Sequence, residues 1–101
     1  MVQDPEYTKY AVLAKLETEV QNPQDLASMW GDIESECDEL GVTVEDSYAV
    51  LGEFDFLILL DAPSRDRVLE AALVLTRYGL DVQTMGIIPT EQFADLVVDD
   101  V

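Results

Sequence analysis

The chain has 101 residues and a mass of 11.3 kDa, near the common size of a single domain. Hydrophobic residues make up 49% of it, a share that argues against disorder, although 22 acidic residues against 5 lysines and arginines leave a formal net charge of −17. This charge argues against nucleic-acid binding, because affinity for nucleic acid depends on the neutralisation of phosphates by lysine and arginine.

The first predicted elements are a strand and a long amphipathic helix. After a polar lead-in over residues 1–7, the segment TKYAVLAKL at residues 8–16 alternates like a strand with one fully apolar face. A helix follows, with Asn22 as its N-cap, Pro23 at its first position and Gly41 just beyond its end. Its apolar side chains recur at helical spacing, and they are Leu26, Met29, Trp30, Ile33, Cys37 and Leu40.

The second half of the chain repeats this layout after a hairpin. Residues 42–51 and 54–61 are predicted strands, joined by a two-residue type II′ turn at Gly52-Glu53. Ser64 caps a helix that extends to about Tyr78, and a fourth strand occupies residues 80–88. Pro89-Thr90 opens a short terminal helix. We expect three apolar side chains of this helix to face inward, namely Phe93, Leu96 and Val97.

This order of elements predicts an α+β fold with a single domain over residues 1–101. Strand–helix–strand–strand–helix–strand is the ferredoxin-like βαββαβ arrangement. Right-handed crossovers place both long helices on one face of a four-stranded antiparallel sheet with strand order 4-1-3-2. The third strand is therefore central in the sheet.

The central strand is apolar on both of its faces, and only one face lies under the helices. If Gly52-Glu53 is the turn, Tyr48 lies opposite Leu57. The face turned away from the helices then holds Leu13, Leu57 and Leu59, together with Asp55, Tyr48, Val50, Ala11 and Lys15. Burying a leucine-sized side chain is worth about 1.5–3 kcal/mol, so we expect a second copy to cover this face. The alternative is a monomer whose terminal helix folds across the sheet.

Lys15 and Asp55 are the first candidates for a binding site on this face. An ammonium and a carboxylate in a partly apolar pocket could hold a polar ligand, with Tyr48, Leu13, Leu57 and Leu59 lining it. The simpler alternatives are a structural ion pair, or an Asp55 that accepts backbone N–H bonds at the hairpin. Tyr48 could equally be a packing residue.

The acidic composition predicts adaptation to high salt. Self-repulsion of the charges destabilises such a protein in dilute buffer, whereas at about 1 M salt the Debye length falls to roughly 3 Å. The chain has only two lysines, Lys9 and Lys15. We therefore expect a cytoplasmic protein of an extreme halophile, with an ordinary acidic protein of a low-salt cell as the alternative.

Membrane and metal roles have no support in the sequence. The uncharged apolar stretches at residues 56–60 and 71–76 are far shorter than the about 20 residues of a membrane span, and the acidic N-terminus MVQDPEY has no secretory pattern. With one cysteine and no histidine, the chain offers no internal disulfide and no Cys/His metal cluster. We expect no metal and no cofactor. The acids Glu45, Asp46 and Glu53 could bind Mg²⁺ or Ca²⁺, although some clustering arises by chance among 22 acids.

The hairpin Gly52-Glu53-Phe54-Asp55 resembles the Gly-x-Tyr-Asp stretch of the GYD-domain family. Residues 10–16, the strand 56–61 followed by Ala62-Pro63, and Thr90-Glu91-Gln92-Phe93 are also similar, so the resemblance covers about residues 8–97. Phe54 replaces the usual tyrosine. The resemblance implies a ferredoxin-like fold that dimerises as an α+β barrel, without an established activity. Effector domains of the leucine-responsive regulator family have a similar hairpin and bind small molecules between subunits, and this chain would be a stand-alone version.

We therefore expect a homo-oligomeric small-ligand-binding or regulatory module, most simply a homodimer, rather than an enzyme. One alternative is a cofactor-independent enzyme that uses a pocket at the dimer interface, as monooxygenase-like barrels do. This alternative rests on fold analogy, and the absence of histidine weakens it. The other alternative is a purely structural association domain. Expected partners are a second copy and a small molecule, with no nucleic acid and no membrane.

Overall fold

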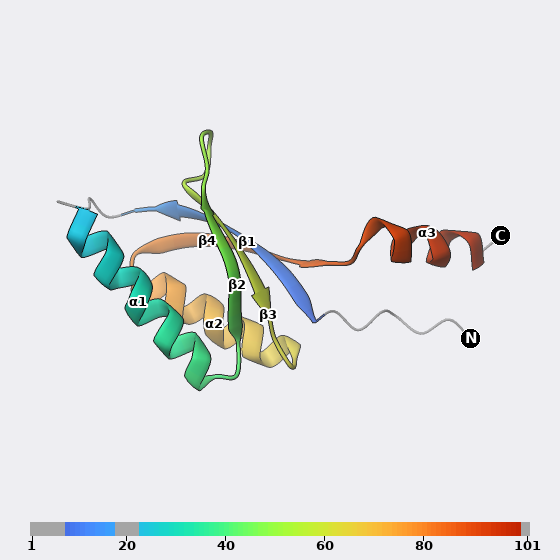
Figure 1. Cartoon of the computed structure of the whole chain (residues 1–101), viewed down its shortest axis with the longest axis horizontal. Helices are drawn as coiled ribbons and strands as arrows, with labels where there is room; N and C mark the ends of the chain where they lie inside the picture. The colour runs from blue at the N-terminus through green and yellow to red at the C-terminus, as the bar shows by residue number, and fades with distance from the viewer. Residues whose placement is uncertain (1–7, 18–22, 100–101) are drawn as a thin grey trace.

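The computed structural model describes residues 8–17 and 23–99, with the side chains of residues 23 and 96–99 left out of the description. The elements follow the predicted order (Figure 1). They are β1 (Lys9–Leu16), α1 (Pro23–Glu39), β2 (Thr43–Ala49), β3 (Phe56–Asp61), α2 (Arg65–Arg77), β4 (Leu80–Ile87) and α3 (Thr90–Asp99).

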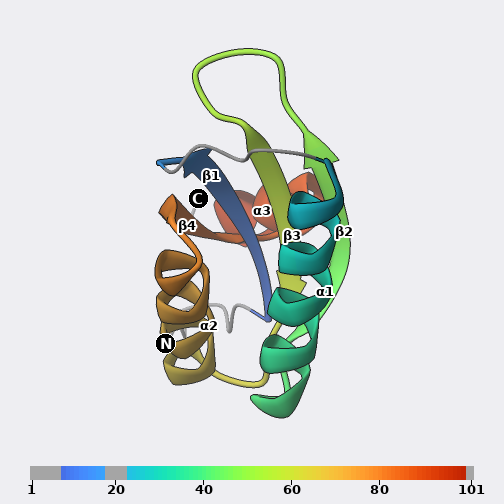
Figure 2. The same ribbon diagram turned by 90° about the vertical axis from the view of Figure 1, so that its left-hand side faces the viewer.

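The four strands form one antiparallel sheet in the order β2-β3-β1-β4, which is the predicted order read from the other edge. Helices α1 and α2 both cover one face of the sheet (Figures 1 and 2). The ferredoxin-like prediction is thereby confirmed for the single chain. No helix in the described part of the chain is both long and apolar enough to cross a membrane.

The hydrophobic core lies between these two helices and the sheet. The inward side chains of β1 and β3 come from alternate positions, as strand geometry requires, and Val12, Ile58 and Leu60 are almost completely buried. Helix α1 contributes Ile33 and Cys37 to the same cluster. At the edge of the core, the rings of Trp30 and Phe56 meet edge to face, with 5.1 Å between their centroids.

The ends of the two long helices follow the predicted capping residues. Asn22 lies outside the described residues, but α1 does begin at Pro23. Gly41 has a φ of 77°, and the N–H of Val42 donates to the carbonyl of Cys37 at 2.9 Å, which closes the end of α1. At the start of α2, the Ser64 hydroxyl accepts a hydrogen bond from the N–H of Arg67 at 3.3 Å.

The hairpin between β2 and β3 is wider than predicted, so the two-residue turn is wrong. Strand β2 ends at Ala49 and β3 begins at Phe56, with a bond of 2.8 Å from the N–H of Val50 to the carbonyl of Asp55 between them. Gly52 has a φ of 158°, far from the about +60° that a type II′ turn requires at its first central position. The pairing of Tyr48 with Leu57 is nevertheless as predicted.

Helix α3 does not pack on the sheet, in contrast to the expectation that its apolar residues face inward. Phe93 is 57% exposed, while Leu96 and Val97 lie outside the described side chains. Pro89 disfavours a helical conformation at Ile88, so the chain stays extended after β4 and carries α3 away from the domain. Figure 1 shows α3 standing off on the side of the sheet opposite α1 and α2.

Candidate functional site on the open face of the sheet

The open face is the surface of the sheet that is turned away from α1 and α2. Its membership follows from the strand registers, because side chains next to the inward Val12 and Ile58 must point outward. Beside the bulge between Val44 and Asp46, β2 contributes the side chain of Glu45 as well. The other members are Lys9, Ala11, Leu13, Lys15, Asp46, Tyr48, Leu57, Leu59, Asp61, Asp81, Gln83, Met85 and Ile87.

The middle of the open face is apolar. Leu13 lies opposite Leu57, and Ala11 lies between Leu59 and Met85 in adjacent strands. Ala11 is buried and the three leucines are half-buried, whereas Tyr48 is 52% exposed. No described element covers these residues, because α3 stands off from the sheet (Figure 1). An apolar belt therefore crosses the sheet and faces away from the domain.

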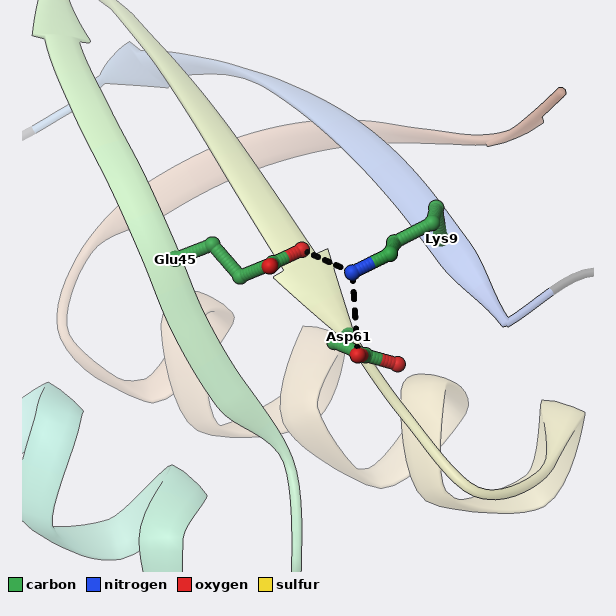
Figure 3. A network of polar contacts seen from close by, with 3 residues as sticks. All are labelled: Lys9, Glu45 and Asp61. Atoms are coloured by element: carbon green, nitrogen blue, oxygen red, sulfur yellow. Dashed lines mark hydrogen bonds and ion pairs between the residues drawn. The ribbon is translucent and has the colours of Figure 1, made fainter. Parts of the chain in front are cut away.

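One end of the open face carries a charged triad that the sequence did not reveal. The Nζ of Lys9 contacts Glu45 Oε1 at 2.7 Å and Asp61 Oδ2 at 3.0 Å (Figure 3). The hydrogen bond to Glu45, followed by that to Asp61, raises the pKa of Lys9 above its usual value. All three side chains are partly exposed, so these pairs contribute little to stability. The signal that could have indicated this triad is the strand register, which pairs Lys9 with Asp61.

At the other end, Asp55 has a structural partner. Its Oδ2 accepts a hydrogen bond of 2.7 Å from the backbone N–H of Leu16, and its own N–H donates to the carbonyl of Ala14 at 2.9 Å. Asp55 thus accepts a backbone N–H, which is the simpler of the roles considered for it. Lys15 is exposed and forms no ion pair with any described residue. The structure does not join Lys15 and Asp55 in an ion pair.

The remaining candidates are gathered as the sequence predicted. Leu13, Leu57, Leu59 and Tyr48 share the open face, with Lys15 at the end of β1 close to the hairpin. They form a surface that is open toward solvent in the single chain. A single chain therefore offers an apolar patch with a cation at its border, and a second surface is needed to enclose a ligand.

Reactive side chains elsewhere have structural surroundings. Burial raises the pKa of the Cys37 thiol, so it stays protonated and unreactive within the core. The hydroxyl of Tyr78 donates to Glu36, and together with Arg77 it holds the pKa of that carboxyl below its usual value. Within residues 8–17 and 23–99, no group of three or more Cys, Asp or Glu side chains is placed to hold a metal ion.

Comparison with known proteins identifies relatives of the fold. The sequence profile of the GYD domain matches residues 10–97. The leucine response regulatory protein LrpA of Mycobacterium tuberculosis superposes with a TM-score of 0.58 at 18% identity, over 80% of this chain and 50% of that one. A crystal structure of a glutamate-to-alanine mutant gives 0.59 at 18% identity, over 83% and 52%. The chain thus spans about half the length of both structures. No curated protein sequence matches it.

Proposed function

The chain belongs to the GYD domain family, and we propose that it is a homodimeric module that binds a small molecule where two open faces meet. The observation that carries this proposal is the uncovered apolar belt of Leu13, Leu57 and Leu59. A contiguous apolar patch of this kind marks an interface more often than it faces water.

Burial energetics support a second copy as the partner. Covering the remaining exposed area of the belt would stabilise the dimer by about 25 cal/mol for each Å² of apolar surface removed from water. A two-fold axis would place the same belt on both sides, so the surface would need to be complementary only to itself. Two sheets packed about 10 Å apart would then form a dimeric α+β barrel. Helix α3 stands off on the side where the partner would lie, so its exposed Phe93 would contact that partner (Figure 1).

The pocket we propose lies at the hairpin end of this interface. Lys15 supplies a cation that has no ion-pair partner among the described residues, and Tyr48 supplies a hydroxyl and an apolar ring. Leu13, Leu57 and Leu59 would contact the apolar part of a ligand, while Asp55 fixes the hairpin beside it. One structural neighbour is a leucine response regulatory protein by name, which supports a regulatory role for a module of this fold.

A purely structural association domain is the second candidate, and one observation favours it. The carboxylate of Asp55 already accepts the N–H of Leu16, so the most prominent polar group at the hairpin has a role without any ligand. In that case the dimer interface would be filled by side chains alone. No contact among the described residues favours the third candidate, a cofactor-independent enzyme, over simple binding.

We further propose that the protein works in the cytoplasm of a cell that maintains molar salt. A net charge of −17 on 101 residues is a large source of repulsion in dilute solution. At about 1 M salt this repulsion acts only over roughly 3 Å, so the compact state and its dimer would both be favoured.

A small-molecule thermal-shift screen in molar KCl tests the binding proposal. Compounds that raise the melting temperature of the parent protein should lose this effect in Lys15→Met. They should retain it in Lys9→Met, which removes the same charge from the opposite end of the open face. Asp55→Asn keeps an acceptor for the N–H of Leu16 and tests whether the carboxylate charge itself contacts the ligand. Hits that bind Lys15→Met and Asp55→Asn as they bind the parent would show that the pocket lies elsewhere.

A further inference from the structure

A cavity within the single chain lies on the opposite side of the sheet from the open face. It has a volume of about 390 Å³ and is situated between the first turns of α2 and the strands β1 and β4. Its size falls within the range of about 300–1,000 Å³ that is common for small-molecule sites. The described residues that line it are Tyr10, Arg65, Val68, Leu69, Thr84 and Gly86.

The lining of this cavity is mostly apolar, with a single charge. Val68 and Leu69 provide aliphatic walls, and Gly86, which lies opposite Tyr10 in the sheet, adds no side chain of its own. Arg65 is the one charged residue among the described residues of the lining, in a chain with 22 acidic residues. By contrast, the groove of about 360 Å³ between α1 and β2 is lined by Glu34 and Asp38.

Arg65 differs from the other two arginines in having no carboxylate partner. Arg67 contacts Glu70 at 2.9 Å, and Arg77 contacts Glu36 at 2.7 Å, whereas Arg65 forms no ion pair with a described residue. A guanidinium presents its N–H donors in a planar fork that matches a carboxylate with two parallel hydrogen bonds. The cavity therefore has an unused group suited to an anion.

Thr84 adds a polar atom that is unsatisfied in the free protein. Its Oγ1 is buried and has no hydrogen-bond partner among the described residues. Such a group destabilises a fold unless something binds it. Because Thr84 lines the cavity, rotation about its Cα–Cβ bond to another staggered rotamer would turn the hydroxyl toward a ligand.

We propose that this cavity binds a small carboxylic acid with an apolar chain. The carboxylate accepts hydrogen bonds from the Arg65 guanidinium and the Thr84 hydroxyl, and the aliphatic chain packs against Val68 and Leu69. The site is built within one chain on the helix-covered side of the sheet, so it does not depend on dimerisation or on the pocket proposed at the open face.

Calorimetric titration of the full chain in molar KCl with 4-methylpentanoate, its primary amide and inorganic phosphate tests the ligand class. We expect saturable binding of the carboxylate and at least tenfold weaker binding of the amide and of phosphate, because the former lacks the charge and the latter lacks the chain. Arg65→Gln should abolish the preference for carboxylate over amide, whereas Arg67→Gln, two residues along the same helix and outside the lining, should preserve it. No saturable binding, equal binding of the amide, or loss of the preference in both variants would overturn the proposal.

Thr84→Val provides an independent test, because it should raise the stability of the ligand-free protein and lower its affinity for the ligand. The substitution keeps the shape of the side chain and removes the unsatisfied hydroxyl, so the ligand-free protein should melt at a higher temperature. The same variant should bind 4-methylpentanoate about tenfold more weakly, through loss of one hydrogen bond to a charged group. Binding that is unchanged in Thr84→Val would contradict the assigned role of the hydroxyl.

Discussion

The carboxylate of Asp55 accepts a hydrogen bond of 2.7 Å from the backbone N–H of Leu16. The backbone pairing of β1 with β3 ends at Ala14 and Phe56, so this side chain continues the connection beyond the last paired residues. Asp55 also donates its own N–H to the carbonyl of Ala14 at 2.9 Å. One residue therefore fixes the wide hairpin to the end of the neighbouring strand.

Asp55→Ala should lower the free energy of unfolding by about 1–2 kcal/mol, because it leaves the N–H of Leu16 without this acceptor. Urea denaturation in molar KCl measures the change. Glu53→Ala is the matched control, since it removes a negative charge from the same hairpin and Glu53 forms no ion pair with a described residue. Equal effects of the two substitutions would show that charge removal alone, and not the hydrogen bond, is responsible.

The bond between Tyr78 and Glu36 should make stability depend on pH in a defined direction. The pKa of Glu36 is lowered, chiefly by the hydrogen bond from the Tyr78 hydroxyl and then by Arg77. The Glu36 carboxylate therefore binds a proton more tightly in the unfolded chain than in the folded one. The contribution is therefore complete above the ordinary glutamate value of 4.5 and is lost as the pH falls through the lower value of the folded state.

Tyr78→Phe should accordingly destabilise the protein at about pH 7 and have a smaller effect at an acidic pH below the lowered pKa of Glu36, where this carboxyl is protonated in both the folded and the unfolded state. Denaturant midpoints at the two pH values measure this difference. A Tyr78→Phe effect of equal size at both pH values would contradict the assignment.

Adaptation to salt predicts that the melting temperature falls as KCl is withdrawn from about 3 M to about 0.1 M, because screening of the acidic surface is lost. Sucrose at matched water activity should not replace the salt, since it does not screen charge. A variant with Glu34→Gln and Asp38→Asn on the exposed side of α1 should require less KCl. Melting that is independent of salt would remove the halophile proposal.

The fold could be predicted because its signals are local. Alternation in β1, the apolar stripe of α1, and the residues Ser64 and Gly41 at the helix ends all act over a few neighbouring positions. The open face could be predicted in the same way, since the pairing of Tyr48 with Leu57 depends on strand register alone. The predicted and observed elements agree because the periodicity of the backbone determines both the elements and their pairing.

The errors arise where residue spacing alone does not decide the structure. Gly52-Glu53 matches a tight turn, but the hydrogen bond that the N–H of Leu16 donates to the Asp55 carboxylate holds the hairpin in a wider form. Phe93 has the spacing of a buried residue, yet the extended chain before Pro89 carries it away from the domain. The triad of Lys9, Glu45 and Asp61 depends on a bulge in β2, which periodicity does not reveal.

The mass of the particle in solution tests the central claim most directly. In analytical ultracentrifugation in molar KCl, the protein should sediment with twice the 11.3 kDa of one chain. Leu57→Glu, in the apolar belt, should shift it to the mass of one chain while the circular dichroism spectrum stays that of a folded domain. Leu73→Glu, the same change at a 65% exposed position on α2, should leave it dimeric. A wild-type protein that sediments at 11.3 kDa across the working concentration range would contradict the account.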